Sequence, residues 1–418
     1  MITLALRSRS ASGPAVAGAF LRGPLPAWAA LFLNVMPFQG SSVLLIPHSL
    51  GQLLAQGALI GALVLALLAN PAMAIRPNVF LAILTTMTVI AFAVSIHNEF
   101  VVGATYRAIR LILFVLVLWM LTPWWGRPDL SLLRAHLSVL KVIIASVWVG
   151  AALAPGPAFS VEGRLSGMVW PIPPPQVAHY AAVLMGATVV LWFCGLVAGR
   201  GTAITLIAAG AALVATHTRT ALLALVLGLV VAGGSLFVGT ARVRRTAAVA
   251  VVGGLATWIV FSPLIVSWLA RGQSSQDLSQ LTGRTKVWAM LAQRHTTTLQ
   301  EIFGTGLGNK SFNGLPIDSN WMATNLELGR VGVALVVAFL IFLFLAALAR
   351  PAGPRRAIAV FLVVYCTTAS FTETGLGDAS PYLLDLVVAA SVAAGPPGWR
   401  RRSLSSRGSS QASRPASM

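Results

Sequence analysis

The chain has 418 residues, of which 57% are hydrophobic and 9% are charged. Its 29 lysines and arginines outnumber 10 acidic residues and give a formal net charge of +19 at pH 7. A soluble protein of this size has no interior large enough for so much apolar surface, whereas a lipid bilayer accommodates it. The arginines are scattered over connecting segments, so we expect membrane lipid to be their partner and nucleic acid not to be one.

Long apolar stretches follow one another along the chain, and most approach the roughly 20 residues that a helix needs to cross the hydrocarbon core. We therefore predict an all-α fold, a polytopic membrane bundle of about twelve transmembrane helices within residues 25–399. Breaks such as Pro37 and Gly40 in the first stretch are tolerated where neighbouring helices cover the backbone. The predicted spans lie near residues 25–45, 51–70, 78–98, 104–123, 136–154, 176–198, 202–217, 220–239, 247–266, 322–349, 357–374 and 380–396.

The basic residues orient this bundle. Residues 1–24 lack a cleavable signal pattern and are predicted to be a cytoplasmic leader. With this leader inside, 19 of the 29 basic residues fall on inner segments, as the positive-inside rule requires. Twelve spans return the chain to the same side, so we predict that both termini are cytoplasmic and that the protein lies in the cytoplasmic membrane. Residues 400–418, rich in Ser and Arg, are predicted to form a disordered tail.

Two outer segments are longer than a turn requires, and long connections in compact proteins are usually functional. One covers residues 155–175, and the larger one, residues 267–321, joins spans nine and ten. Val287, Trp288 and Leu291 are spaced to line one side of a helix there. We expect the larger segment to pack over the membrane face as a lid or small subdomain.

Two basic motifs in the outer segments have the chemistry to bind phosphate. Arg219 lies in the polar pentad Thr216–Thr220, where a guanidinium could grip two phosphate oxygens. The same pentad would also suit a tight turn whose arginine reaches lipid headgroups. Arg284 and Lys286 in the larger segment add a second guanidinium and an ammonium, or else form a solvated charge run.

Two further motifs lie near the end of the larger segment. Gly304, Gly306 and Gly308 lack the preceding strand and following Lys-Ser/Thr of a nucleotide loop, so we expect a flexible turn that lets the backbone approach a ligand. Asp318 precedes the tenth span, where a carboxylate could act as a general base toward a sugar hydroxyl. Alternatively, Asp318 or Ser319 is the N-cap of the next helix.

In order and spacing, these motifs resemble those of the O-antigen ligase and O-antigen polymerase superfamily over about residues 160–345. The family's Arg-x-x-Gly motif is similar to Arg164–Gly167, its Ser-Arg-Gly/Thr-Ala motif to Thr218–Ala221, and its Gly-Arg-x-x-x-Trp motif to Gly283–Trp288. The alternating glycines and a Glu-Leu-Gly-x-x-Gly motif, similar to 327–332, follow in the family's order.

The resemblance implies a GT-C-like membrane glycosyltransferase that polymerises oligosaccharide repeat units. The implied donor is a glycan on polyprenyl diphosphate, the acceptor a growing polysaccharide, and a flippase and a chain-length regulator are implied partners. Arg219, Arg284 and Arg164 would bind the diphosphate, because preplaced arginines stabilise the charge that develops on it. Such chemistry requires no metal or cofactor, and the sequence has no Asp-x-Asp or histidine cluster to hold a metal.

One position departs from the ligase pattern. Ligases of this family carry a histidine, thought to be catalytic, nine residues before the motif glutamate, and this chain has Asp318 there. Polymerases of the family often have Asp, so we expect a polymerase with Asp318 as the base. Lys286, His217 and His295 are secondary candidates. A ligase stays open as an alternative, as does a flippase or transporter, although no internal repeat supports a transporter.

Overall fold

The computed structural model of the chain describes residues 23–39, 42–44, 46–237, 239–270, 284–294, 296–308, 310–312 and 314–395. The predicted leader up to residue 22 and the predicted disordered tail lie outside these described residues. Within them the fold is almost wholly helical, with one short antiparallel hairpin in which Ser311 pairs with Pro316 and Phe312 with Leu315.

The first half of the chain forms helices α2 Leu25–Val35, α3 His48–Ala69, α4 Val79–Ser95, α5 Val101–Met120, the 3-10 turn η1 Thr122–Trp124, α6 Ser131–Leu153, α7 Pro155–Ala158, α8 Pro174–Phe193 and α9 Arg200–Ala215. The second half forms α10 Arg219–Leu236, α11 Ala241–Ala270, α13 Arg284–Ala292, α14 Thr298–Phe303, strands β1 Ser311–Phe312 and β2 Leu315–Pro316, and helices α15 Asn320–Leu348, α16 Pro354–Ala369 and α17 Pro381–Ala393.

In the described part of the chain, six helices are long and apolar enough to cross a membrane, namely α3, α5 with η1, α6, α8, α10 and α15. The two halves of α11, bent by 46°, make a seventh if they count as one span, and α2, α4, α9 and α17 are shorter apolar helices. The prediction of an all-α, polytopic membrane protein is confirmed at this level.

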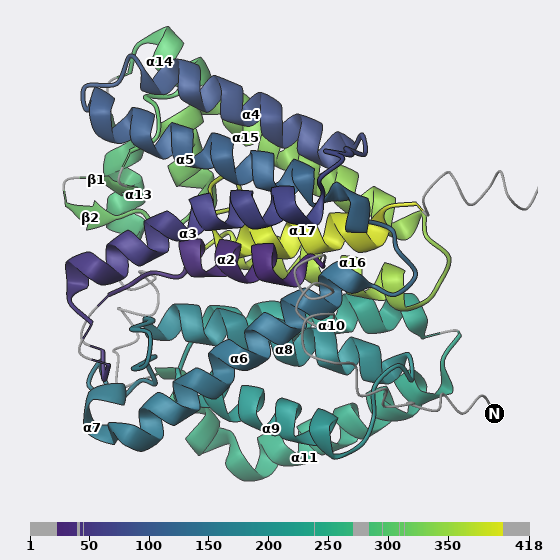
Figure 1. Ribbon diagram of the computed structural model, residues 1–418. Coiled ribbons are helices and arrows are strands. Elements are labelled where there is room, and N and C mark those ends of the chain that lie inside the picture. The colour runs from purple at the N-terminus through teal and green to yellow at the C-terminus, as the bar shows by residue number, and fades with distance from the viewer. Residues whose placement is uncertain are drawn as a thin grey trace, which may run out of the picture.

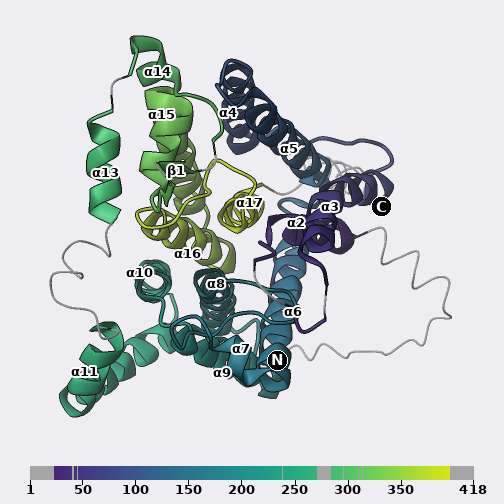
Figure 2. The same ribbon diagram turned by 90° about the vertical axis from the view of Figure 1, so that its left-hand side faces the viewer.

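The helices lie side by side, and the bundle has two distinct ends (Figure 1). We call the end that carries α7, α13, α14 and the hairpin the loop end, and Figure 2 views the molecule from there. Backbone hydrogen bonds join separate segments at the loop end, such as Leu165 to Ala215 and Asn320 to Ser370. The opposite end carries the connection from α5 to α6 and the end of α17, joined by a hydrogen bond from Gly126 to Ser391.

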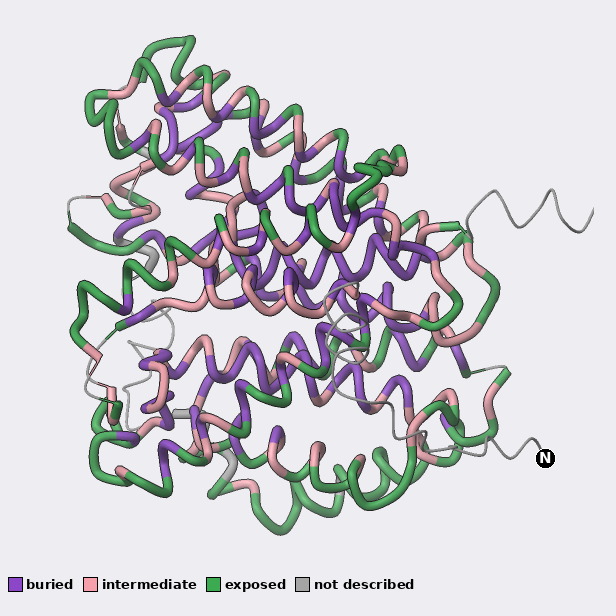
Figure 3. Tube along the Cα trace, viewed as in Figure 1, coloured by how far each residue is buried: buried purple, intermediate pink, exposed green. Residues whose placement is uncertain are grey.

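Helices α8, α16 and α17 form the centre of the bundle: most of their residues are buried and none is exposed (Figure 3). Small residues let the helices approach closely, since a Cβ at Gly186 of α8 or Gly228 of α10 would collide with the Phe361 ring of α16. In contrast, α11 and much of α3 expose large apolar side chains, as expected for faces that meet lipid.

Three details differ from the sequence prediction. The first predicted span is interrupted, because α2 ends at Val35 just before Pro37, a residue that kinks or breaks a helix in its interior. Arg107 and Arg110, which the predicted topology counts as external, lie inside α5. Lys141, one of the 19 basic residues that the topology assigns to inner segments, is an exposed residue within α6.

Candidate functional site

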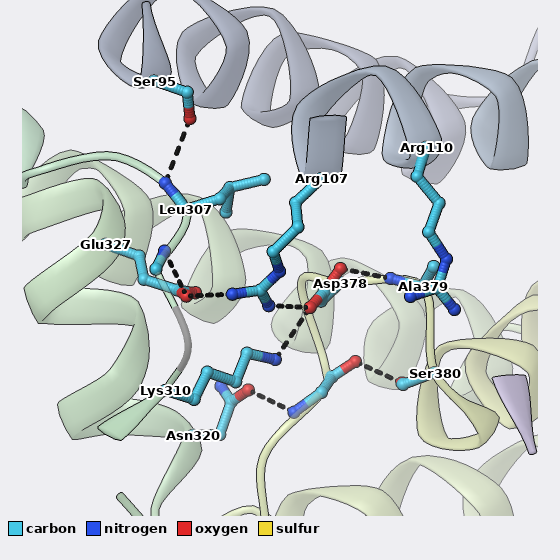
Figure 4. A network of polar contacts seen from close by, with 12 residues as sticks. Ser95, Arg107, Arg110, Leu307, Lys310, Asn320, Glu327, Asp378, Ala379 and Ser380 are labelled. Atoms are coloured by element: carbon cyan, nitrogen blue, oxygen red, sulfur yellow. Dashed lines mark hydrogen bonds and ion pairs between the residues drawn. The ribbon is translucent and has the colours of Figure 1, made fainter. Parts of the chain in front are cut away.

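A network of charged side chains lies at the loop end, between α5, α15 and the segment that leads into α17 (Figure 4). Arg107 donates from Nη2 to Oδ2 of Asp378 at 2.9 Å, and its Nη1 lies 3.4 Å from Oε1 of Glu327. Nζ of Lys310 lies 3.0 Å from the same Asp378 oxygen. Two cations and two carboxylates from four segments therefore meet in a largely buried place.

Local structure explains how these side chains meet. Arg107 and Arg110 are three residues apart on α5 and so share one helix face. Arg110 donates from Nη2 to the Asn34 carbonyl at 2.9 Å, and Figure 4 shows its side chain beside Asp378. On the other side, Asn320, the first residue of α15, accepts from the backbone N–H of Leu376 at 2.9 Å and so fixes the loop that carries Asp378.

The charges around Asp378 determine its protonation. Burial by itself would raise the pKa of this carboxyl, but the positive charges of Lys310 and Arg107 outweigh it and hold the pKa of Asp378 well below its ordinary value. Asp378 is therefore an ionised partner for cations and a poor candidate for a general base near neutral pH.

The alternating glycines pack against α15 backbone to backbone. Gly304 (φ 78°) and Gly306 (φ 89°) both take left-handed conformations, and Gly329 interrupts the helical geometry of α15 with φ 62° and ψ −161°. The N–H of Gly306 donates to the Glu327 carbonyl at 2.9 Å, and that of Gly308 donates to the Glu327 side chain at 3.0 Å. At Gly304 the close approach is to the protein's own backbone, because a Cβ there would collide with the Glu327 backbone. The expected approach of this turn to a ligand stays a prediction.

A groove of about 1180 Å³ runs beside the network. One wall is the end of α4 and the start of α5, with His97, Asn98 and Phe100, and the other is α14 and the glycine turn. Gly308 lines the groove and donates to Glu327, so the groove ends against the charged network. Its walls combine aromatic rings with amide, imidazole and carboxylate groups, a combination that suits a polar ligand with apolar faces.

Arg164 belongs to a second polar group at the loop end. Its Nε donates to the Thr216 carbonyl at 2.9 Å, and its Nη2 donates to Oγ1 of Thr218 at 3.2 Å. Burial lowers the pKa of Arg164, and Glu162 and Glu373 oppose this effect. The guanidinium thereby holds the turn 216–218 that leads directly into Arg219, the first residue of α10.

Residues 370–380, the loop between α16 and α17, connect the two polar groups. Near the beginning of the loop, Thr372 donates to Thr220 at 2.8 Å, and Glu373 acts electrostatically on Arg164. Near its end, Asp378 binds Arg107 and Lys310. The turn before Arg219 and the Arg107 network are thus held by the two ends of one short loop.

The other predicted site residues have varied outcomes. The predicted helix at 285–293 is confirmed as α13, and Val287 and Leu291 pack in a small cluster with Ile317. Asp318 is partly buried directly before α15. The N-cap of α15 is Ser319, one of the two residues predicted for this position, although its side chain makes no capping hydrogen bond. The ring of His217 stacks on Trp268 at 5.4 Å. His295 and the side chains of Arg284 and Lys286 lie outside the described part of the chain.

A second cluster of polar, ionisable side chains, which the sequence analysis missed, is buried in the centre of the bundle. Asp385 of α17 lies 3.1 Å from Nε2 of His136 on α6 and 3.2 Å from Nε2 of His179 on α8. Nδ1 of His179 lies 3.2 Å from the Tyr365 hydroxyl of α16. All three ionisable residues are at most 1% exposed, so the cluster connects four helices through polar contacts in their interior.

Some of the missed residues left a signal in the sequence. Two arginines three apart at the start of an apolar stretch indicate a functional position, because charges inside a membrane face the bundle interior. Glu327 belongs to the Glu-Leu-Gly-x-x-Gly motif, which by itself indicates no role for its side chain. Among the described residues, no group of three or more His, Cys, Asp or Glu is placed to hold a metal ion.

Comparison of the chain with models of known protein families finds no match, and comparison with curated proteins finds no match either.

Proposed function

We propose that the protein polymerises oligosaccharide repeat units carried on polyprenyl diphosphate, by metal-independent glycosyl transfer at the outer face of the cytoplasmic membrane. In this proposal twelve helices cross the membrane, namely α2 to α6, α8 to α11 and α15 to α17, and the loop end faces outward.

One observation carries the proposal: basic side chains from separate segments converge on one end of a membrane bundle, beside an open groove. Arg107 and Arg110 come from α5, Arg164 from the segment before α8, Arg219 from α10 and Lys310 from the segment before β1. Charged side chains in or near a membrane cost desolvation free energy, and a bound anion can offset this cost. The diphosphate of a lipid-anchored substrate is such an anion.

The proposed reaction divides these residues by role. Arg219 and Arg284 bind the donor's diphosphate, and Arg164 positions Arg219 by holding the turn before it. The acceptor hydroxyl attacks the anomeric carbon, the bond from that carbon to the diphosphate oxygen breaks, and polyprenyl diphosphate leaves with the electron pair. Asp318 takes the hydroxyl proton, and the arginines stabilise the charge that develops on the diphosphate.

The groove gives the acceptor glycan a place beside this chemistry. It is bordered by exposed apolar residues such as Phe100 and Leu299, so a lipid-linked glycan can enter from the side of the bundle with its lipid still in the membrane. Glu327 and Arg107 lie where the groove meets the charged network and would orient the incoming sugar.

Deletion of the gene followed by analysis of lipid-linked glycans tests the proposal. We expect single repeat units on polyprenyl diphosphate to accumulate and the polymer to disappear, and purified protein should convert the accumulated glycan to polymer with release of polyprenyl diphosphate. Accumulation of finished polymer on the lipid would indicate a ligase instead. If neither pool changes, the proposal is wrong.

A transporter is the second candidate, and the buried cluster of Asp385 and two histidines favours it, because ionisable groups inside membrane bundles often mark ion or proton pathways. Proteoliposomes distinguish the two: a transporter moves the lipid-linked glycan between leaflets without changing its length, whereas a polymerase lengthens it.

A further inference from the structure

A cavity of about 320 Å³ lies at the opposite end of the bundle, where the start of α4 meets the ends of α15 and α17. Arg76 and Arg350 stand on its wall together with Asn78 and Trp125. The remaining wall is largely apolar and includes Phe342, Leu343, Ala346 and Ala390. Two guanidinium groups therefore face a space that is otherwise lined mainly by hydrocarbon.

The two arginines are held by backbone carbonyls. Nη1 of Arg76 donates to the Trp125 carbonyl at 2.8 Å, and Nε of Arg350 donates to the Ala393 carbonyl at 2.6 Å. In the described part of the chain, neither arginine forms a salt bridge with a carboxylate. Neutral backbone carbonyls thus fix their positions, and no carboxylate among the described residues forms a salt bridge with them.

Further positive charge lies close by. Burial, and after it the charge of Arg127, lowers the pKa of Arg76. Nη2 of Arg355 donates to the Arg127 carbonyl at 2.7 Å, and Arg350 and Arg355 repel each other in the same way. Asp129 offsets part of this repulsion at Arg355, and a bound anion would offset more of it.

We propose that this cavity binds the phosphate of an anionic glycerophospholipid, with its acyl chains lying along α4 and α15. The arginine forks match the oxygens of a phosphate. Large apolar residues next to the cavity on the same helices are exposed, including Val79 at 53% and Leu345 at 60%, and so provide a lipid-facing surface for the chains.

The charge distribution of the chain supports a lipid rather than a free anion. The predicted topology places this end in the cytoplasm, where the leaflet carries anionic lipids, and basic pockets between helices on that side bind lipid headgroups. The N-terminal end of α4, capped by Asn78, adds a partial positive charge to the same cavity. The inference does not depend on the proposed glycosyl transfer.

Native mass spectrometry of the full-length protein in detergent tests the site. We expect phosphatidylglycerol to remain bound more strongly than phosphatidylcholine, whose choline adds a cation beside the arginines. The double substitution R76Q/R350Q should weaken phosphatidylglycerol binding at least tenfold. Arg134→Gln is the matched control, because it removes a positive charge from an exposed position at the start of α6, at the same end of the molecule.

Three results would overturn the proposal. Equal losses in the control and the double variant would mean that diffuse charge attracts the lipid. Release of phosphatidylglycerol by inorganic phosphate would mean that the cavity is a site for a free anion. If the double variant does not fold, a photoactivatable phosphatidylglycerol on the wild-type protein decides: labelling should concentrate near Val79 and Leu343, and even labelling of the whole apolar surface would contradict the site.

Discussion

At the scale of single residues, Arg164 and Arg219 show how one arginine can position another. Arg164 donates hydrogen bonds to the turn 216–218, and α10 begins at Arg219 directly after that turn. In the proposed function, Arg164 is therefore structural and Arg219 binds the substrate.

Arg219→Lys tests the second role. Lysine keeps the charge but loses the planar fork that grips two phosphate oxygens, so we expect polymer formation to fall by about one to two orders of magnitude. The protein level should change little, since a lysine at the membrane edge still reaches the headgroups. Arg200→Lys is the control, because Arg200 also begins an apolar helix, α9, and is exposed. Wild-type chain length in the Arg219 variant would leave this residue as a helix anchor.

The identity of the base is a second question at this scale, and two conservative variants separate the candidates. Asp318→Asn cannot accept a proton near neutral pH, so we expect polymer formation to drop about a hundredfold or more. The change leaves the helix start intact, because the N-cap is Ser319. Glu327→Gln keeps an acceptor for the Gly308 N–H and should retain measurable activity. If the Asp318→Asn variant is active and the Glu327→Gln variant is inactive, Glu327 is the base.

At the scale of elements, the glycine turn and the start of α15 depend on each other. The φ and ψ of Gly329 lie in a region that is essentially restricted to glycine, and a Cβ there would collide with the Ile302 carbonyl group. Gly329→Ala should therefore destabilise the protein by about 1–3 kcal/mol or more, measured as thermal unfolding in detergent. Gly57→Ala is the control, since nothing lies within 4 Å of the Cβ that alanine would add at this position on α3. Equal stability of the two variants would show that the turn can relax.

The cluster around Asp385 also joins separate elements, because its polar contacts connect α6, α8, α16 and α17. Asp385→Asn replaces one of the two carboxyl oxygens that contact buried imidazoles by an amide group, and leaving a buried polar group without its partner costs about 1–3 kcal/mol. We expect a marked decrease in the thermal unfolding temperature. The exposed Asp129→Asn should stay within about 0.5 kcal/mol of wild type. A loss no larger than that of the control would mean that the carboxylate charge is dispensable for stability.

At the scale of the whole molecule, the distribution of basic residues predicts which end faces outward. In a background without Cys194 and Cys366, Ser160→Cys at the loop end should react with a membrane-impermeant thiol reagent in intact cells. Asp129→Cys at the opposite end should react only after lysis. Both positions are exposed, so a difference in labelling reports the side of the membrane and not burial. The reverse pattern would contradict the predicted orientation.

Sequence patterns predicted the helices of this fold better than they predicted the contacts between those helices. Apolar composition over windows of about 20 residues decides which segments become membrane helices, and this information is local. The helix at α13 was also predictable, because Val287 and Leu291 recur at helical spacing. The end of α2 before Pro37 shows the limit of the same approach, since the apolar stretch continues past the point where the helix stops.

The sequence by itself determined that this protein is an all-α membrane bundle with two long segments between helices, because hydropathy and charge act residue by residue. Only the tertiary structure decided which charges meet. Arg107 and Asp378 are 271 positions apart, and His136, His179 and Asp385 come from three helices. Such contacts depend on how the helices pack and rotate against one another. An ionisable residue in an apolar stretch is stable in the low-dielectric interior only when packing places a polar partner beside it.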